Sequence, residues 1–192
     1  MCKQKCLCIA AIFLYPLAIA SVLCNLLLLF PGWSYVYLLD HNITQEVYYM
    51  GGLVAGLTVL IPDIFLRLSE RWLCCNNQCC KVVFALVLEI VGVCGAAYSF
   101  IVALFGMMNG PYCLYYGSWV TPFTYRSESY LFRKDWWGWC TEPNNIVEFN
   151  VALFSTLMVI SGMKIVLCVS RVISVMIACL CCLPLTLSAT KP

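Results

Sequence analysis

The sequence predicts an all-α integral membrane protein: a four-transmembrane-helix bundle with a small disulfide-closed extracellular loop between helices three and four. Of its 192 residues, 63% are hydrophobic and only 10% are charged, and the mean hydropathy is +0.91. A soluble domain carries about 25% charged residues, so this chain has too little polar surface for water. The expected partners are membrane lipids and other membrane proteins. A formal charge of +2 does not indicate a nucleic-acid partner.

Four apolar stretches reach the length of about 20 residues that a spanning helix needs. The first stops at Pro31-Gly32, the third at Gly110-Pro111 and the fourth before Pro184. The expected segments are 1–30 (cytoplasmic N-terminus and first helix), 31–46 (short extracellular loop), 47–68 (second helix), 69–81 (Cys-rich cytoplasmic loop), 82–108 (third helix), 109–145 (large extracellular loop), 146–182 (fourth helix) and 183–192 (cytoplasmic tail).

A cleaved signal peptide is the competing interpretation of the first stretch. Lys3 and Lys5 precede an apolar run that contains Ala18-Ile19-Ala20, a pattern typical of a cleavage site. The run continues through four leucines at 26–29, which makes it too long for a signal core. An uncleaved first helix is therefore the favoured prediction.

Basic residues predict the orientation, because Lys and Arg gather in cytoplasmic loops. The loop 31–46 has neither, and the basic residues of the other outer loop lie in a longer segment where charge counts for less. Both termini are therefore expected in the cytoplasm. The cytoplasmic side would then hold Lys3, Lys5, Arg67, Arg71, Lys81, Arg171 and Lys191.

Cysteines gather at the predicted cytoplasmic face, most densely in CCNNQCC at 74–80. The cytosol keeps thiols reduced, and juxtamembrane cysteines are common sites of S-palmitoylation. Acylation is favoured over unmodified thiols and over a Cys₄ zinc site, whose usual ligand spacing these pairs fit loosely. No metal or cofactor is expected. The candidate palmitoylation sites are Cys2, Cys6, Cys8, Cys74, Cys75, Cys79, Cys80, Cys179, Cys181 and Cys182.

The large outer loop holds Cys113 and Cys140, which face an oxidising compartment and are expected to form a disulfide. The dense aromatic residues between them indicate either a loop packed on itself and the bilayer or a partner surface. The partner-surface candidates are Trp119, Tyr130, Trp136, Trp137 and Trp139. In the short outer loop, Asn42-Ile43-Thr44 is an N-glycosylation sequon, which makes Asn42 a candidate.

Ionisable residues within the predicted spans are functional candidates, because charges inside a bilayer are rare and costly. They are Asp63, Glu89, Lys164 and Arg171. A Glu89–Lys164 pair that fixes helix register is favoured, with separate snorkelling and a ligand or ion site left open. Small residues at Gly52 and Gly56 permit close helix approach, within the bundle or in a homo-oligomer.

Several motifs resemble the four-transmembrane L-six antigen family, which is similar in architecture to the tetraspanins. They are LLLLFPGW at the end of the first helix, the Cys-rich inner loop, GPYC at 110–113, WCTEP at 139–143 and IVEFNVALFS at 146–155. The resemblance covers nearly the whole chain. It implies a palmitoylated, glycosylated protein of the plasma membrane and of endosomal or lysosomal membranes.

Two functions follow as hypotheses. The resemblance implies a non-enzymatic scaffold that organises receptors such as integrins or growth-factor receptors in membrane microdomains and affects adhesion, motility or growth. No catalytic set is evident, since His41 is the only histidine. The alternative is a small transporter or ligand sensor that uses Asp63, Glu89 and Lys164.

Overall fold

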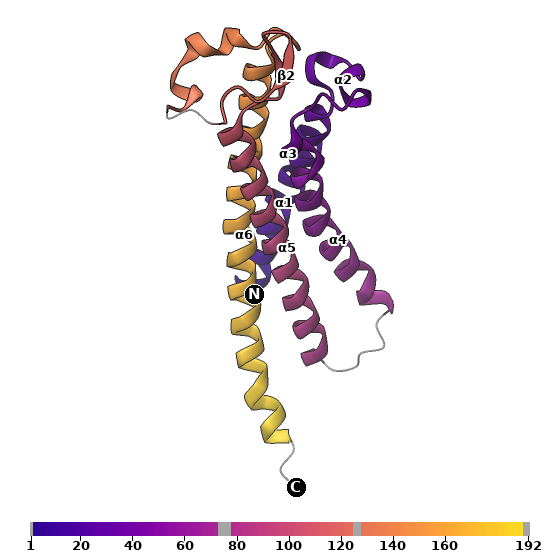
Figure 1. Cartoon of the computed structure of the whole chain (residues 1–192). Helices are drawn as coiled ribbons and strands as arrows, with labels where there is room; N and C mark the ends of the chain where they lie inside the picture. The colour runs from indigo at the N-terminus through magenta and orange to yellow at the C-terminus, as the bar shows by residue number, and fades with distance from the viewer. Residues whose placement is uncertain (1, 73–77, 125–127, 190–192) are drawn as a thin grey trace.

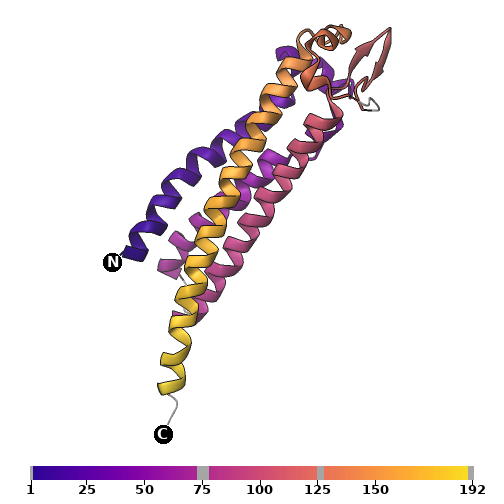
Figure 2. The same ribbon diagram turned by 90° about the vertical axis from the view of Figure 1, so that its left-hand side faces the viewer.

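Four long helices form a bundle in the computed structural model. The structure describes the backbone of residues 2–72, 78–124 and 128–189. It describes side chains for residues 12–61, 64, 83–124 and 128–177. The helices are α1 (Cys2–Leu28), α4 (Gly51–Trp72), α5 (Gln78–Asn109) and α6 (Ile146–Ala189). They run along one another, and the chain ends marked N and C both lie away from the loops at the opposite end (Figures 1 and 2). The N-terminus and the C-terminus therefore lie on the same side of the structure.

The loops at the other end build what we call the head, residues 30–50, 110–124 and 128–145. Its first part contains η1 (Pro31–Trp33), α2 (Val36–Leu39) and α3 (Gln45–Tyr48). Its second part contains β1 (Cys113–Tyr115), β2 (Ser118–Val120), η2 (Tyr130–Phe132) and η3 (Lys134–Trp139). The sequence predicted two outer loops here without these short elements.

One face of α6 is buried over most of its described length. From Asn150 onward, most of its buried positions follow in steps of three and four residues, and this average spacing of about 3.5 is typical of helices that pack in a left-handed bundle. The face comprises Asn150, Phe154, Leu157, Ser161, Lys164, Cys168, Arg171 and Val175. Two of the charged residues singled out from the sequence thus lie seven residues apart on one buried face.

Close approach of α1 and α4 depends on two glycines. A Cβ added to Gly52 would lie 2.4 Å from the Ser21 carbonyl oxygen, and one added to Gly56 would lie 2.4 Å from Cγ2 of Val22. Real side chains do not pack at that distance, so the small-residue motif brings these two helices together. The interpretation as packing within the bundle accounts for both glycines.

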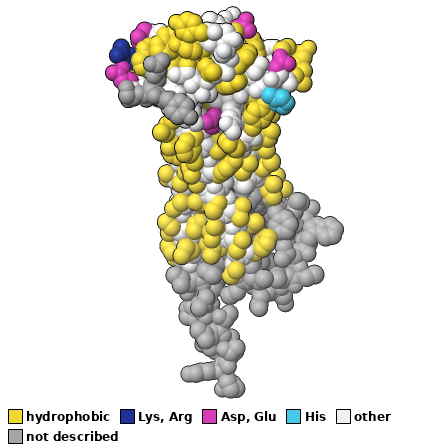
Figure 3. Space-filling model, viewed as in Figure 1, with side chains coloured by type: hydrophobic (Ala, Val, Ile, Leu, Met, Phe, Trp, Pro, Cys, Tyr) yellow, Lys and Arg dark blue, Asp and Glu magenta, His cyan; other side chains and the backbone are white. Residues whose placement is uncertain are grey.

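Apolar side chains cover the exterior of the bundle, and the charged side chains visible on this face gather at the head (Figure 3). Within the described residues, Val83–Asn109 and Ile146–Ile177 are long and apolar enough to cross a membrane, whereas the apolar helices Ile12–Leu28 and Gln45–Ile61 are shorter. The predicted segments 1–30, 47–68, 82–108 and 146–182 each fall largely within one long helix. The expected stop before Pro184 is wrong, because α6 continues through this proline to Ala189. That all four cross the bilayer stays a prediction.

Candidate functional site: the head and the buried charges

The predicted disulfide between Cys113 and Cys140 is present and closes the second part of the head. The two cysteines are 27 residues apart in sequence, with 5.5 Å between their Cα atoms. Cys113 is completely buried, and its strand is linked to the segment after Cys140 by backbone hydrogen bonds between Leu114 and residues 141–142. The bond therefore joins two segments that the backbone already holds together.

A tight hairpin follows Cys113. Strands β1 and β2 pair antiparallel, with Tyr115 opposite Ser118. The two turn residues, Tyr116 and Gly117, both have positive φ, 47° and 79°, as a two-residue type I′ turn requires. Because the turn is tight and projects outward, the Tyr116 side chain is 89% exposed.

Most aromatic residues of the head pack on one another. Tyr130 is 2% exposed, stacks on Phe123 with ring centroids 4.5 Å apart, and donates a hydrogen bond of 2.8 Å to the Met107 carbonyl oxygen. Trp137 in turn donates to the Tyr130 carbonyl oxygen at 2.9 Å. Burial, and secondarily the Glu46 carboxylate, raise the pKa of the Tyr130 hydroxyl. Tyr130 is thus part of the core of the head.

The predicted partner surface is therefore wrong at Tyr130. The other four candidates are partly buried: Trp136, Trp137 and Trp139 pack against the core that contains Tyr130, and Trp119 contacts the rings of Tyr37 and Tyr112. The physical reason is that a short disulfide-closed loop has few aliphatic residues, so its aromatic residues supply its core.

Three other aromatic side chains of the head are strongly exposed. Trp33 is 79% exposed, and Tyr116 and Phe132 are each 89% exposed. Tyr35 and Leu39 add exposed apolar area beside Trp33, at 66% and 69%. We call Trp33, Tyr116 and Phe132 the exposed aromatic set. Two signals in the sequence could have indicated it: the Pro-Gly turn before Trp33 and the Tyr-Gly turn after β1.

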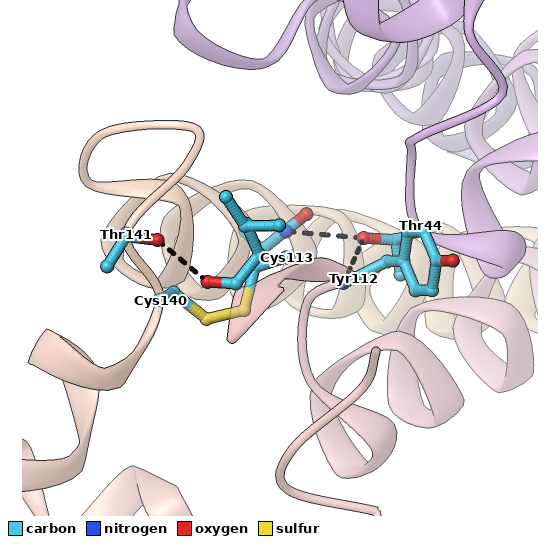
Figure 4. Close-up of a disulfide and its surroundings, with 7 residues drawn as sticks. Thr44, Tyr112, Cys113, Cys140 and Thr141 are labelled. Carbon is cyan, nitrogen blue, oxygen red and sulfur yellow. Dashed lines mark hydrogen bonds between the residues drawn. A yellow bond between two sulfur atoms is a disulfide. The ribbon is translucent and has the colours of Figure 1, made fainter. Parts of the chain in front are cut away.

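Thr44 joins the two parts of the head to α6. Its side chain is 3% exposed, and its hydroxyl oxygen accepts hydrogen bonds from the Tyr112 backbone N–H at 3.3 Å and from Asn150 Nδ2 at 3.4 Å. Tyr112 directly precedes the disulfide cysteine (Figure 4). The threonine of the predicted glycosylation sequon therefore also has a structural role, while Asn42 itself is partly exposed.

Glu46 of α3 lies where the head meets the bundle. It is 9% exposed, and its Oε1 accepts a hydrogen bond of 2.5 Å from Nδ2 of Asn109, the last residue of α5. Nothing in the sequence pattern singled out this carboxylate, because it stands in a short polar loop and not in an apolar stretch.

Glu89 forms its ion pair with Arg171 and not with Lys164. Oε1 of Glu89 and Nη2 of Arg171 are 2.6 Å apart, and the side chains are 6% and 8% exposed. The pair joins α5 to α6. The Glu89–Lys164 pair favoured from the sequence is therefore wrong. The part of α6 that faces Glu89 is the turn around Arg171, which lies about two turns further along the helix than Lys164.

Lys164 contacts α1 instead. It is completely buried, and its Nζ donates a hydrogen bond of 2.9 Å to Oγ of Ser21, which itself donates to the Ala18 carbonyl oxygen at 2.9 Å. A neutral hydroxyl is a weak partner for an ammonium group, which has three protons to donate. Lys164 is therefore a buried charge held by one neutral side chain.

The remaining sequence candidates lie where the structure does not describe side chains. They are Asp63 and the ten proposed acylation sites, so none of these is placed here. Three further cysteines lie within the helices as free thiols: Cys24 is partly buried, Cys94 is exposed and Cys168 is buried. No group of metal-ligating residues occurs within the described part of the chain.

The fold and the disulfide-closed head define the class: a helical membrane protein with an apolar bundle and a small, disulfide-closed, aromatic-rich head. The family model for L6 membrane protein matches residues 1–183. The chain belongs to this family.

The sequence similarity to curated relatives extends over almost the whole chain. The chain is 38% identical to transmembrane 4 L6 family member 4 of Rattus norvegicus, over 94% of this chain and 93% of the relative. It is 36% identical to member 4 of Homo sapiens with the same coverage, and 33% identical to member 1 of Homo sapiens over 94% of each chain. No solved structure matches the chain.

Proposed function

We propose that the protein is a non-enzymatic membrane scaffold that holds receptors in membrane microdomains and so affects adhesion, motility or growth. Integrins and growth-factor receptors are the first candidates, as the family resemblance implies. The observation that carries this proposal is the exposed aromatic set of the head.

The exposed aromatic set is unusual for a surface that faces water. Trp33, Tyr116 and Phe132 are all at least 79% exposed, while the neighbouring tryptophans pack inward. Aromatic residues are enriched where proteins bind one another. The membrane-proximal part of a receptor in the same bilayer would meet this surface.

The proposed topology places the head outside the cell and both termini in the cytoplasm, at the plasma membrane and in endosomal or lysosomal membranes. Its support is that both chain ends lie opposite the head (Figure 1) and that the loop 31–46 has no Lys or Arg. Acyl chains on the ten cytoplasmic cysteines would then control lateral sorting, since each adds about 0.8 kcal/mol per buried CH₂ to membrane affinity.

Mild-detergent pull-down from the native membrane tests the scaffold function. The wild-type chain is compared with a Trp33→Ser, Tyr116→Ser, Phe132→Ser variant and with an Asp135→Ser, Asn144→Ser control, which changes two exposed polar positions of the same head. We expect wild type and control to recover a defined receptor and the aromatic variant to lose it. Recovery of nothing beyond background by the wild type would contradict the scaffold function.

A variant that lacks the ten cytoplasmic cysteines tests the role of acylation in the same pull-down. Loss of the receptor with this variant, and its retention when only the exposed Cys94 is replaced by Ser, supports an acylation-dependent scaffold. Equal recovery by both variants would separate receptor binding from acylation.

The transporter or ligand-sensor alternative gains no support from the buried charges. It needs Asp63, Glu89 and Lys164 to share one binding site. Glu89 is engaged with Arg171 of α6, and Lys164 is engaged with Ser21 of α1. Two of the three charges thus have different partners on different helices, as structural charges do.

A further inference from the structure

The Glu46 carboxylate is buried without a cationic partner among the described residues. It is 9% exposed, and its one hydrogen bond comes from the Asn109 amide. A carboxylate offers about four lone-pair positions, so this contact satisfies it only in part. Removing an ionised carboxylate from water without a counter-charge is unfavourable, which makes the position one where a cation would bind well.

Two cavities meet at Glu46, and both include Gln45, Glu46 and Asn109 in their walls. One is polar, lies in the head and has a volume of about 470 Å³; its other walls are His41, Ile43, Tyr48, Tyr112, Thr121 and Thr124. Neither cavity has a Lys or Arg among its described lining residues. The Glu46 carboxylate therefore meets no Lys or Arg in either cavity, and the imidazole of His41 in the polar cavity is hydrogen-bonded to the Tyr48 hydroxyl.

The second cavity is mainly apolar, has a volume of about 530 Å³ and follows the outer face of α5. Tyr98, Val102 and Phe105 line it, at the i, i+4 and i+7 spacing of one helix face. Phe105 is 51% exposed, and all three lie within Val83–Asn109, a helix apolar and long enough to cross a membrane. This cavity is thus open to the surrounding acyl chains at one end and reaches Glu46 at the other.

We propose that these two cavities form a binding site for an ammonium group carried on an apolar chain, an amphiphilic amine taken from the leaflet that surrounds the head. The Glu46 carboxylate pairs with the ammonium group, and the Tyr48 and Tyr112 rings that line the polar cavity suit a cation. The chain lies along Val102 and Phe105. An anionic head group would be repelled by Glu46, and a neutral one would leave it unpaired. The site is separate from the exposed aromatic set and does not rest on the scaffold function.

Photolabelling of the purified full-length protein in neutral-lipid nanodiscs tests the site, with photoreactive sphingosine as the probe. We expect wild type to be labelled and Glu46→Gln to be labelled about ten-fold less, the loss that corresponds to one charge-assisted contact. Glu148→Gln is the matched control, because it removes an exposed carboxylate at the start of α6, and its labelling should equal wild type. Equal labelling of wild type and Glu46→Gln would overturn the proposal.

Competition on the wild-type protein needs no variant and decides the chemistry of the ligand. Dodecylamine should displace the probe, whereas dodecanol and butylamine at the same concentration should not. Equal competition by dodecanol would show that the amine is not recognised. Equal competition by butylamine would show a site for small soluble cations, which overturns the amphiphile. Because these competitors act on the native chain, the proposal stays testable even if Glu46→Gln fails to fold.

Discussion

Arg171 of α6 and Glu89 of α5 form an ion pair across the bundle, with 2.6 Å between Nη2 and Oε1 and less than a tenth of either side chain exposed. The two residues fix the relative register of two helices whose other contacts are mainly apolar and could slide.

Removing one member of this pair should destabilise the bundle strongly. Glu89→Gln leaves a buried guanidinium without its counter-charge, a cost of about 3 kcal/mol or more in the free energy of unfolding. The midpoint of thermal unfolding in mild detergent measures it. The double variant Glu89→Gln, Arg171→Leu should be less destabilised than the sum of the single variants; simple additivity would show that the two charges do not interact.

Replacing Lys164 by Met, in contrast, should not lower the stability of the bundle. The ammonium group has lost its water, and Ser21 returns only one hydrogen bond, so an apolar side chain of similar length should leave stability unchanged or raise it by about 1 kcal/mol. Thermal unfolding in detergent measures this, with Ser21→Ala as the companion variant, which should lower stability. A large loss of stability in Lys164→Met would instead show that the charge is required.

The helical segments could be predicted from the sequence, whereas the pairing of the charges could not. Apolar length predicts where each helix lies, and the Pro-Gly and Gly-Pro stops predict the ends of α1 and α5, because these signals depend only on neighbouring residues. The predicted stop before Pro184 is wrong, since α6 continues to Ala189. The choice of Arg171 over Lys164 for Glu89 depends on how far α5 and α6 are shifted along each other, which no local pattern contains. The inward packing of Tyr130 has a similar cause: sequence shows that the loop is aromatic, but not which ring faces the core.

Loss of the disulfide should open the head without unfolding the bundle. Cys113→Ser removes a covalent loop closure worth about 3 kcal/mol in the chain-entropy account. Arg133 and Lys134 are exposed next to this core, so trypsin cleavage there under native conditions should become faster. Cys94→Ser, which changes an exposed free thiol of α5, is the control. Equal cleavage rates in the two variants would mean that the aromatic core holds the head closed by itself.

The predicted glycosylation of Asn42 and the structural role of Thr44 can be separated by changing the two residues one at a time. Thr44→Ala removes the glycosylation signal and also the acceptor for Tyr112 and Asn150, which should lower the free energy of unfolding by about 1–3 kcal/mol. Asn42→Gln removes only the glycosylation signal. Gel mobility before and after glycosidase treatment, together with thermal unfolding, distinguishes them. Equal stability of the two variants would contradict the structural role of the threonine hydroxyl.

Tyr130 should make the head sensitive to alkaline pH. Burial first and the Glu46 carboxylate second raise the pKa of its hydroxyl in the folded protein, whereas an unfolded tyrosine has a pKa of about 10. Below that pH the hydroxyl is protonated in both states, and the stability from its hydrogen bond to Met107 is fully present. Above it the unfolded chain releases a proton that the folded head retains, so stability falls as pH rises.

Tyr130→Phe should be less stable at neutral pH and should lose part of this alkaline decline, measured by unfolding at a series of pH values. An alkaline decline identical to wild type would assign the effect to other groups.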